Sequence, residues 1–180
     1  LAAQKRPVWI RFVVVPGWAT MKSMTALLFV LSGISLAAPF RRLKRLSAWI
    51  IVLISALTLG QYLFNVDLGI DRLLFTHPAT GSLYPDRMSP ATTLAFLLAG
   101  CSLLSVHKTV ESWFERSFII AVFTISLLAL IGYLYGVSSL YKIGVYSSMA
   151  LHTAATMLLL SFAILFARPD RGLMSTILAE

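Results

Sequence analysis

Five apolar runs constrain this chain more than any other feature, because every charged residue lies outside them. Of the 180 residues, 58% are hydrophobic and 12% are charged, and the mean hydropathy is +0.85. A soluble domain carries about twice that share of charge, and a helix needs about 20 apolar residues to cross a bilayer. The sequence therefore predicts an all-α, polytopic membrane bundle of about five transmembrane helices, at residues 24–40, 46–64, 90–106, 118–137 and 147–167.

One helix opening occurs three times, at residues 21–29, 88–96 and 149–157. Each copy begins with methionine, and a threonine follows four residues later, at Thr25, Thr92 and Thr153. A second phrase precedes two of the copies, at residues 62–66 and 133–137. Self-similarity in a fixed order indicates duplicated units that stack on each other. We therefore expect a bundle built from repeated helix–loop–helix units.

The apolar runs also divide the chain into three parts. We expect residues 1–20 to form an N-terminal interfacial segment, processed or truncated because the chain begins with Leu1 rather than methionine. Residues 21–167 are expected to form the transmembrane bundle, with an outer loop at 65–89, and residues 168–180 a cytoplasmic tail.

Lysine and arginine residues predict the orientation of the bundle in the membrane. Cytoplasmic loops carry an excess of Lys and Arg. One side of the predicted bundle holds Arg41, Arg42, Lys44, Arg45, Lys108, Arg116, Arg168 and Arg171. The other side, leaving out the N-terminal stretch with Lys5, Arg6 and Arg11, holds only Arg72, Arg87 and Lys142. The basic turn at 41–45 and the C-terminus are therefore expected in the cytoplasm. The net charge of +8 needs no nucleic acid as a partner, since anionic lipid of the inner leaflet is sufficient.

The loop at 65–87 carries Asp67, Asp71, Arg72, His77, Asp86 and Arg87. It could form an outer ligand cap, but polar composition alone is weak support, and we favour a solvated connector. Ser89 and Pro90 after it are typical of a helix start, with a hydroxyl cap and a proline in the first turn.

His152 is the candidate cofactor ligand, because it is an ionisable group inside an apolar run. It could bind haem, relay a proton or pack as a polar group. His77 and His107 do not match its expected depth, so we favour packing.

Small residues and hydroxyls indicate close helix packing. Gly33, Gly100 and Ala154, together with Thr25, Thr92 and Thr153, are expected at helix contacts. Cys101 is a single cysteine, which excludes an internal disulfide. No phosphate loop, HExxH motif or nucleophile elbow occurs, and no carboxylate lies within a predicted helix. We therefore expect no enzyme and no metal site.

Four stretches resemble the membrane input regions of bacterial sensor proteins: residues 16–22, 132–137, 148–154 and 167–172. The similar regions are the multi-helix N-terminal parts of histidine kinases and of PAS- or GGDEF-containing proteins. The resemblance implies a sensory input module of the bacterial inner membrane, coupled to a cytoplasmic signalling domain.

Two functions therefore stay open. The chain is either a sensory module that acts through helix packing or a small hydrophobic ligand, or an accessory subunit of a larger photosynthetic or respiratory complex. In the second case its partners are other membrane helices or subunits. The sequence identifies no particular cofactor.

Overall fold

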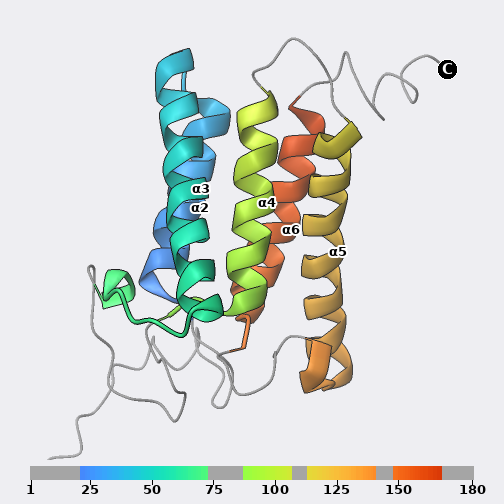
Figure 1. Ribbon diagram of the computed structural model, residues 1–180. Coiled ribbons are helices and arrows are strands. Elements are labelled where there is room, and N and C mark those ends of the chain that lie inside the picture. Colours follow the sequence, from blue (N-terminus) through green and yellow to red (C-terminus); the bar gives the residue numbers. More distant parts are fainter. Residues whose placement is uncertain (1–20, 73–86, 107–112, 141–147, 168–180) are drawn as a thin grey trace, which may run out of the picture.

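The computed structural model describes residues 21–72, 87–106, 113–140 and 148–167 (Figure 1). This part of the chain is helical and contains no strand, which confirms the all-α fold class. The expected segments 1–20 and 168–180 lie outside the described residues. The elements are α2 (Ser23–Ala37), α3 (Arg41–Leu63), η1 (Ile70–Arg72), α4 (Pro90–Val106), α5 (Trp113–Tyr135), η2 (Ser138–Leu140) and α6 (Leu151–Phe166).

The five α-helices run alternately up and down, so that neighbours in sequence are antiparallel (Figure 1). The connection between α2 and α3 and the ends of α4 and α6 lie at one end of the bundle, and the segments after α3 and α5 lie at the other. Helix α4 occupies the centre, because it contacts α2, α3, α5 and α6. Its buried residues point to several sides, as expected of a helix surrounded by others.

Proline residues determine two of the helix boundaries. Pro39 disfavours helical dihedrals at Ala38, which is extended with ψ 143°, so α2 ends at Ala37. The expectation that the next helix begins near residue 46 is wrong, because α3 begins at Arg41 and includes the basic residues. Arginine and lysine are good helix formers, so the helix starts as soon as Pro39 is passed. Pro90 begins α4 after Ser89, whose Oγ accepts the Thr92 N–H at 3.2 Å, as the sequence predicts.

The duplicated phrases adopt equivalent structures. The Tyr62 hydroxyl donates to the Met88 carbonyl at 2.5 Å, and the Tyr133 hydroxyl donates to the Met149 carbonyl at 2.5 Å. Three residues after each tyrosine the chain takes a left-handed conformation, with φ 54° at Asn65 and 68° at Gly136. Asparagine and glycine tolerate this conformation best, and it commonly ends a helix. Each tyrosine therefore joins the end of one helix to the methionine that opens the next copy.

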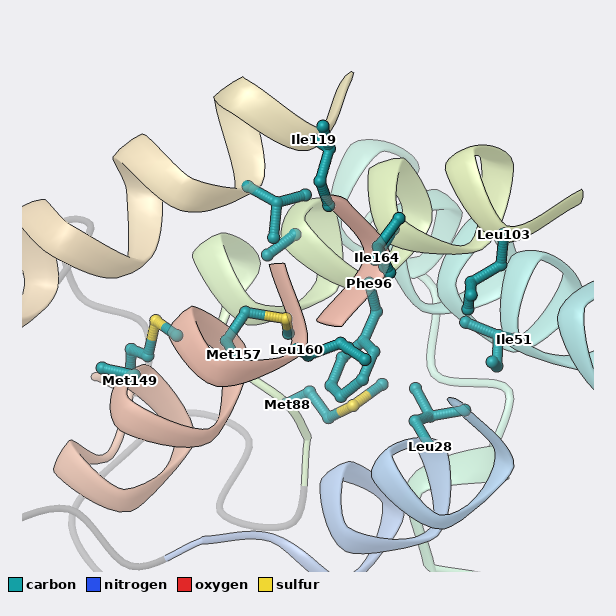
Figure 2. Packing of buried hydrophobic residues seen from close by; sticks show 14 of the residues in the cluster. Leu28, Ile51, Met88, Phe96, Leu103, Ile119, Met149, Met157, Leu160 and Ile164 are labelled. Carbon is teal, nitrogen blue, oxygen red and sulfur yellow. The ribbon is translucent and has the colours of Figure 1, made fainter. Parts of the chain in front are cut away.

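The hydrophobic core lies where α4 meets the other helices (Figure 2). Phe96 of α4 is fully buried, and its ring meets Phe29 of α2 edge to face, with 4.8 Å between ring centroids. The cluster also takes side chains from α2, α3, α5 and α6, among them Leu28, Ile51, Val122, Met157 and Leu160. Met88 and Met149, the openers of two copies, are buried there as well.

The small residues differ in what they contact. A Cβ at Gly100 would lie 2.8 Å from Val52 Cγ2 and 3.3 Å from the Val52 nitrogen, so α3 and α4 approach closely there. Ala154 is fully buried, and Thr25, Thr92 and Thr153 are also buried. Gly33 is exposed on α2, with no atom within 4 Å of an added Cβ. The expected helix contact at Gly33 is therefore not made within the described bundle.

Two helices of the described chain are long and apolar enough to cross a membrane, Arg41–Leu63 and Ser117–Tyr135. The other apolar helices, Ser23–Ala37, Pro90–Ser105 and Leu151–Phe166, are shorter. The structure thus gives a helical bundle with two candidate spans, and a bundle with five spans stays a prediction.

Substitution of the two glycines tests the close approach of α3 and α4. Gly100→Ala should destabilise the bundle by about 1–3 kcal/mol, because the added methyl overlaps Val52. Gly33→Ala is the matched control and should stabilise by roughly 0.5–1 kcal/mol, since alanine loses less backbone entropy in a helix. Unfolding followed by circular dichroism in mild detergent gives both values. A Gly100→Ala variant as stable as the parent chain would contradict the packing described above.

Candidate functional site

The candidate site is a buried polar cluster at the end of the bundle where α3 stops and α4 starts. Its centre is Arg87, which directly precedes Met88 and is 1% exposed. The other members are Gln61 in the last turn of α3, Asp67 in the segment after it, and Asp71 in η1. Buried arginines are rare unless they are paired, so the partners of Arg87 define what the site is.

The guanidinium of Arg87 reaches partners far back in the sequence. Its Nε donates to Asp71 Oδ2 at 3.1 Å, and its Nη2 donates to Gln61 Oε1 at 3.0 Å and to the Val66 carbonyl at 3.3 Å. Asp67 Oδ1 lies 3.5 Å from Nη2 but is 39% exposed, so water weakens this second ion pair. The Arg87 Cζ also lies 5.2 Å from the centroid of the Tyr62 ring, within cation–π range.

Gln61 connects the arginine to the segment after α3. Its Oε1 also accepts the Leu68 N–H at 3.0 Å, while its Nε2 donates to Asp71 Oδ2 at 3.2 Å. Gln61 is 1% exposed, so its side-chain amide forms hydrogen bonds with protein groups rather than with solvent. The chain between α3 and η1 is thus held to both the glutamine and the arginine.

Local turn chemistry places the two carboxylates. Asp67 Oδ1 accepts the Gly69 N–H at 3.0 Å, and Gly69 has φ 69°, which only glycine adopts easily. This turn leads directly into η1, which carries Asp71. Asp71 Oδ2 receives two hydrogen bonds, whereas its Oδ1 is buried without a partner in the described structure. A buried oxygen of this kind is uncommon in native proteins.

Buried polar groups continue from the cluster along the inner face of α3. Thr58 and Ser55 lie one and two turns before Gln61, both are fully buried, and their hydroxyls have no hydrogen-bond partner in the described structure. Other helical hydroxyls bond the carbonyl four residues earlier, as Ser32 and Ser126 do. The second half of α3 therefore carries small polar side chains on its inner face.

The described part of the second hairpin, α5 to α6, provides an internal comparison for the cluster. The α5–α6 connection has the same tyrosine–carbonyl bond, from Tyr133 to Met149. Gly132 and Ser148 occupy the positions that correspond to Gln61 and Arg87, directly before Tyr133 and Met149. Within the described residues, the second hairpin therefore has the tyrosine bond but neither the arginine nor the glutamine at these two positions, and the Arg87 cluster is found at the α3–α4 junction.

Several of the sequence-based predictions require correction here. The segment 65–87 is not simply a solvated connector, because Asp71 and Arg87 at its described ends are buried. His77 and Asp86 lie outside the described residues. His152 is exposed on α6 and does not pack between the helices, and its proposed role as a cofactor ligand stays a prediction. No three His, Cys, Asp or Glu side chains of the described part of the chain gather as metal ligands would.

Sequence reasoning missed Gln61 and undervalued Arg87. A signal for Gln61 was present, since it is the one amide side chain inside the apolar run at 46–64. For Arg87 the signal was weaker: it stands directly before a repeat, where the other copies have Thr20 and Ser148.

Comparisons with protein-family models, with curated proteins and with solved structures found no match to this chain.

A double-mutant cycle tests whether Arg87 and Asp71 stabilise each other. Arg87→Met and Asp71→Asn should each cost about 3–5 kcal/mol, because each leaves a buried polar partner uncompensated. The double variant should lose less than the sum of the two, with a coupling of roughly 0.5–3 kcal/mol. Asp67→Asn is the control and should cost less than about 1 kcal/mol, because its ion pair is partly solvated. Additive losses would show that the two groups act independently.

Proposed function

We propose that this chain is a non-catalytic, integral membrane module that acts as a sensory input domain of the bacterial inner membrane. The observation that carries the proposal is the buried Arg87 cluster, which joins the end of α3 to the start of the central helix α4. In membrane proteins, buried ionisable groups commonly mark functional positions.

The surface of the bundle supports a position in the membrane. The most apolar windows of α3 and α5 are only 33% and 28% buried, whereas the core helix of a soluble protein is mostly buried. Large apolar side chains are exposed on all five helices, among them Val30, Leu53, Leu94, Leu128 and Leu159. Exposed apolar faces of this extent favour contact with lipid or with other membrane helices.

The position of the cluster supports a sensory role. Arg87 directly precedes Met88. The Met88 carbonyl accepts the hydrogen bond from the Tyr62 hydroxyl, and the Met88 side chain is buried in the core. A stimulus that displaced Arg87 from Asp71 would act directly on the start of α4. Because α4 contacts each of the other helices, its movement would reach the opposite end of the bundle. There the expected cytoplasmic signalling domain would respond.

The ligand in this proposal is a small molecule that competes for hydrogen bonds within the Arg87 cluster. Asp71 Oδ1 is a buried acceptor without a partner in the described structure, so a hydrogen-bond donor on the ligand would find an acceptor there. The apolar helix ends around the cluster suit a ligand that is otherwise hydrophobic.

One observation favours the alternative, an accessory subunit of a larger membrane complex. Gly33 and Ala37 are both exposed on α2, four residues apart. Small residues at this spacing allow a second membrane helix to approach closely. A partner subunit seated on α2 would use this face.

The native reading frame after Glu180 distinguishes the two functions. Kinase, PAS or GGDEF sequence there would support the sensor, whereas a stop codon and co-migration with a large complex in blue-native electrophoresis would support the subunit.

Membrane position and orientation are tested with single cysteines. The chain should resist extraction by alkaline carbonate. On a Cys101→Ser background, Val66→Cys and Leu43→Cys lie at opposite ends of the bundle and are both exposed. An impermeant maleimide should label position 66 in intact cells and position 43 only after lysis. Labelling of both positions in intact cells, or release by carbonate, would contradict the proposal.

A further inference from the structure

Three arginines at the start of α3 form a charged patch at the end of the bundle opposite the Arg87 cluster. Arg41, Arg42 and Arg45 are exposed, and their side chains make no hydrogen bond or ion pair within the described part of the chain. Lys44 differs from them, because its Nζ donates to the Leu36 carbonyl at 3.0 Å and the residue is half-buried. Lys44 therefore stabilises the α2–α3 turn, whereas the three arginines do not. These three arginines are called the arginine patch below.

The arginine patch does not stabilise its own helix. The N-terminus of a helix carries a partial positive charge, so cations at the start of a helix have an energetic cost. Arg41 and Arg45 are also like charges four residues apart, which adds repulsion. The first turn of α3 holds no acidic residue that would compensate. A negatively charged partner would remove this cost.

The surroundings of the patch indicate the chemistry of that partner. Arg45 and Trp49 are four residues apart on one face of α3, and Trp49 is exposed. Exposed Leu46, Leu53 and Leu57 continue the helix away from the charges, and Phe40 is exposed beside them. A sharp change from arginine to tryptophan and leucine is typical of the boundary between lipid headgroups and acyl chains.

We propose that the arginine patch binds the phosphate of anionic phospholipid headgroups. Guanidinium groups match phosphate oxygens in a bidentate geometry, and the neighbouring apolar side chains would contact the acyl chains of the same lipid. An acidic protein segment or a nucleic acid would satisfy the charges but leave the apolar side chains without a partner. The proposal rests on the membrane position proposed above and assigns to this end of the bundle a preference for anionic lipid.

Native mass spectrometry of the purified chain in neutral detergent tests this preference. Phosphatidylglycerol and phosphatidylcholine are titrated separately. The parent chain should retain phosphatidylglycerol preferentially. An anionic surface contributes about 1 kcal/mol per basic residue, a factor of about five in affinity, so Arg41→Gln, Arg42→Gln and Arg45→Gln together should weaken phosphatidylglycerol binding roughly a hundredfold.

Two controls separate charge from position. The triple Arg→Lys variant keeps the charge and should retain most of the binding, with a smaller loss from the missing bidentate contacts. Lys22→Gln removes a charge at the other end of the bundle and should leave phosphatidylglycerol binding unchanged.

Several results would overturn the inference. Equal retention of the two lipids by the parent chain would do so, as would equal phosphatidylglycerol binding by the parent and the triple Gln variant. Binding of poly-glutamate by the arginine patch, without a lipid preference, would assign it to an acidic protein partner. Carbonate extraction separates failure of this inference from failure of the proposed function. A chain that stays in the membrane but shows no lipid preference contradicts this inference alone. A chain released by carbonate contradicts the proposed membrane module as well.

Discussion

The contact between α3 and α4 is the constraint on which the rest of the bundle depends. It is fixed in the middle, where Gly100 allows Ile51 and Val52 to approach the backbone of α4. It is fixed again at one end, where Arg87 binds Gln61 and the Tyr62 hydroxyl binds the Met88 carbonyl. Two separated points of contact determine both the distance and the rotation of one helix against the other. The remaining helices then pack around α4, which contacts all of them.

Two kinds of hydrogen bond hold polar side chains inside the bundle, with different consequences. Ser32, Ser47 and Ser126 donate to carbonyls four residues earlier, so each is satisfied within its own helix. Arg87 donates instead to groups that tertiary contacts bring to it. The first kind places no demand on neighbouring helices, whereas the second fails if the helix ends separate. A buried charge of this kind is therefore suited to report a small displacement.

The duplicated hairpins separate what is structural from what is specific. Both use a tyrosine, a left-handed residue and a methionine carbonyl to connect one helix to the next. Only the α3–α4 junction adds the arginine and the glutamine, where the other hairpin has Ser148 and Gly132. Because these two positions differ between hairpins that share the tyrosine bond, Arg87 and Gln61 are the best candidates for a role beyond folding among the described residues. The repeat within one chain thus supplies an internal comparison.

The sequence by itself determined the all-α class and the start of α4 at Pro90, because these depend on composition and on residues close in the chain. The predicted helix at 24–40 runs through Pro39, whereas α2 ends at Ala37. The sequence also identified the repeated segments that contain Tyr62, Tyr133, Met88 and Met149. The hydrogen bonds from the tyrosine hydroxyls to the methionine carbonyls are visible only in the structure. Only the tertiary structure decided which faces lie inside. Apolar residues occur on both sides of these helices, and the inner face of α3 carries Ser55, Thr58 and Gln61. The periodicity of hydrophobic residues therefore does not indicate which face of a helix is buried.

For the same reason Gly33 and Gly100 were indistinguishable in the sequence, yet one is exposed and the other lies against Val52. The Arg87 cluster was also beyond reach of local patterns, since its partners Asp71 and Gln61 lie 16 and 26 residues earlier in the chain. A pairing over such distances is decided by how closely two helix ends meet, and that depends on side chains packed elsewhere along α3 and α4.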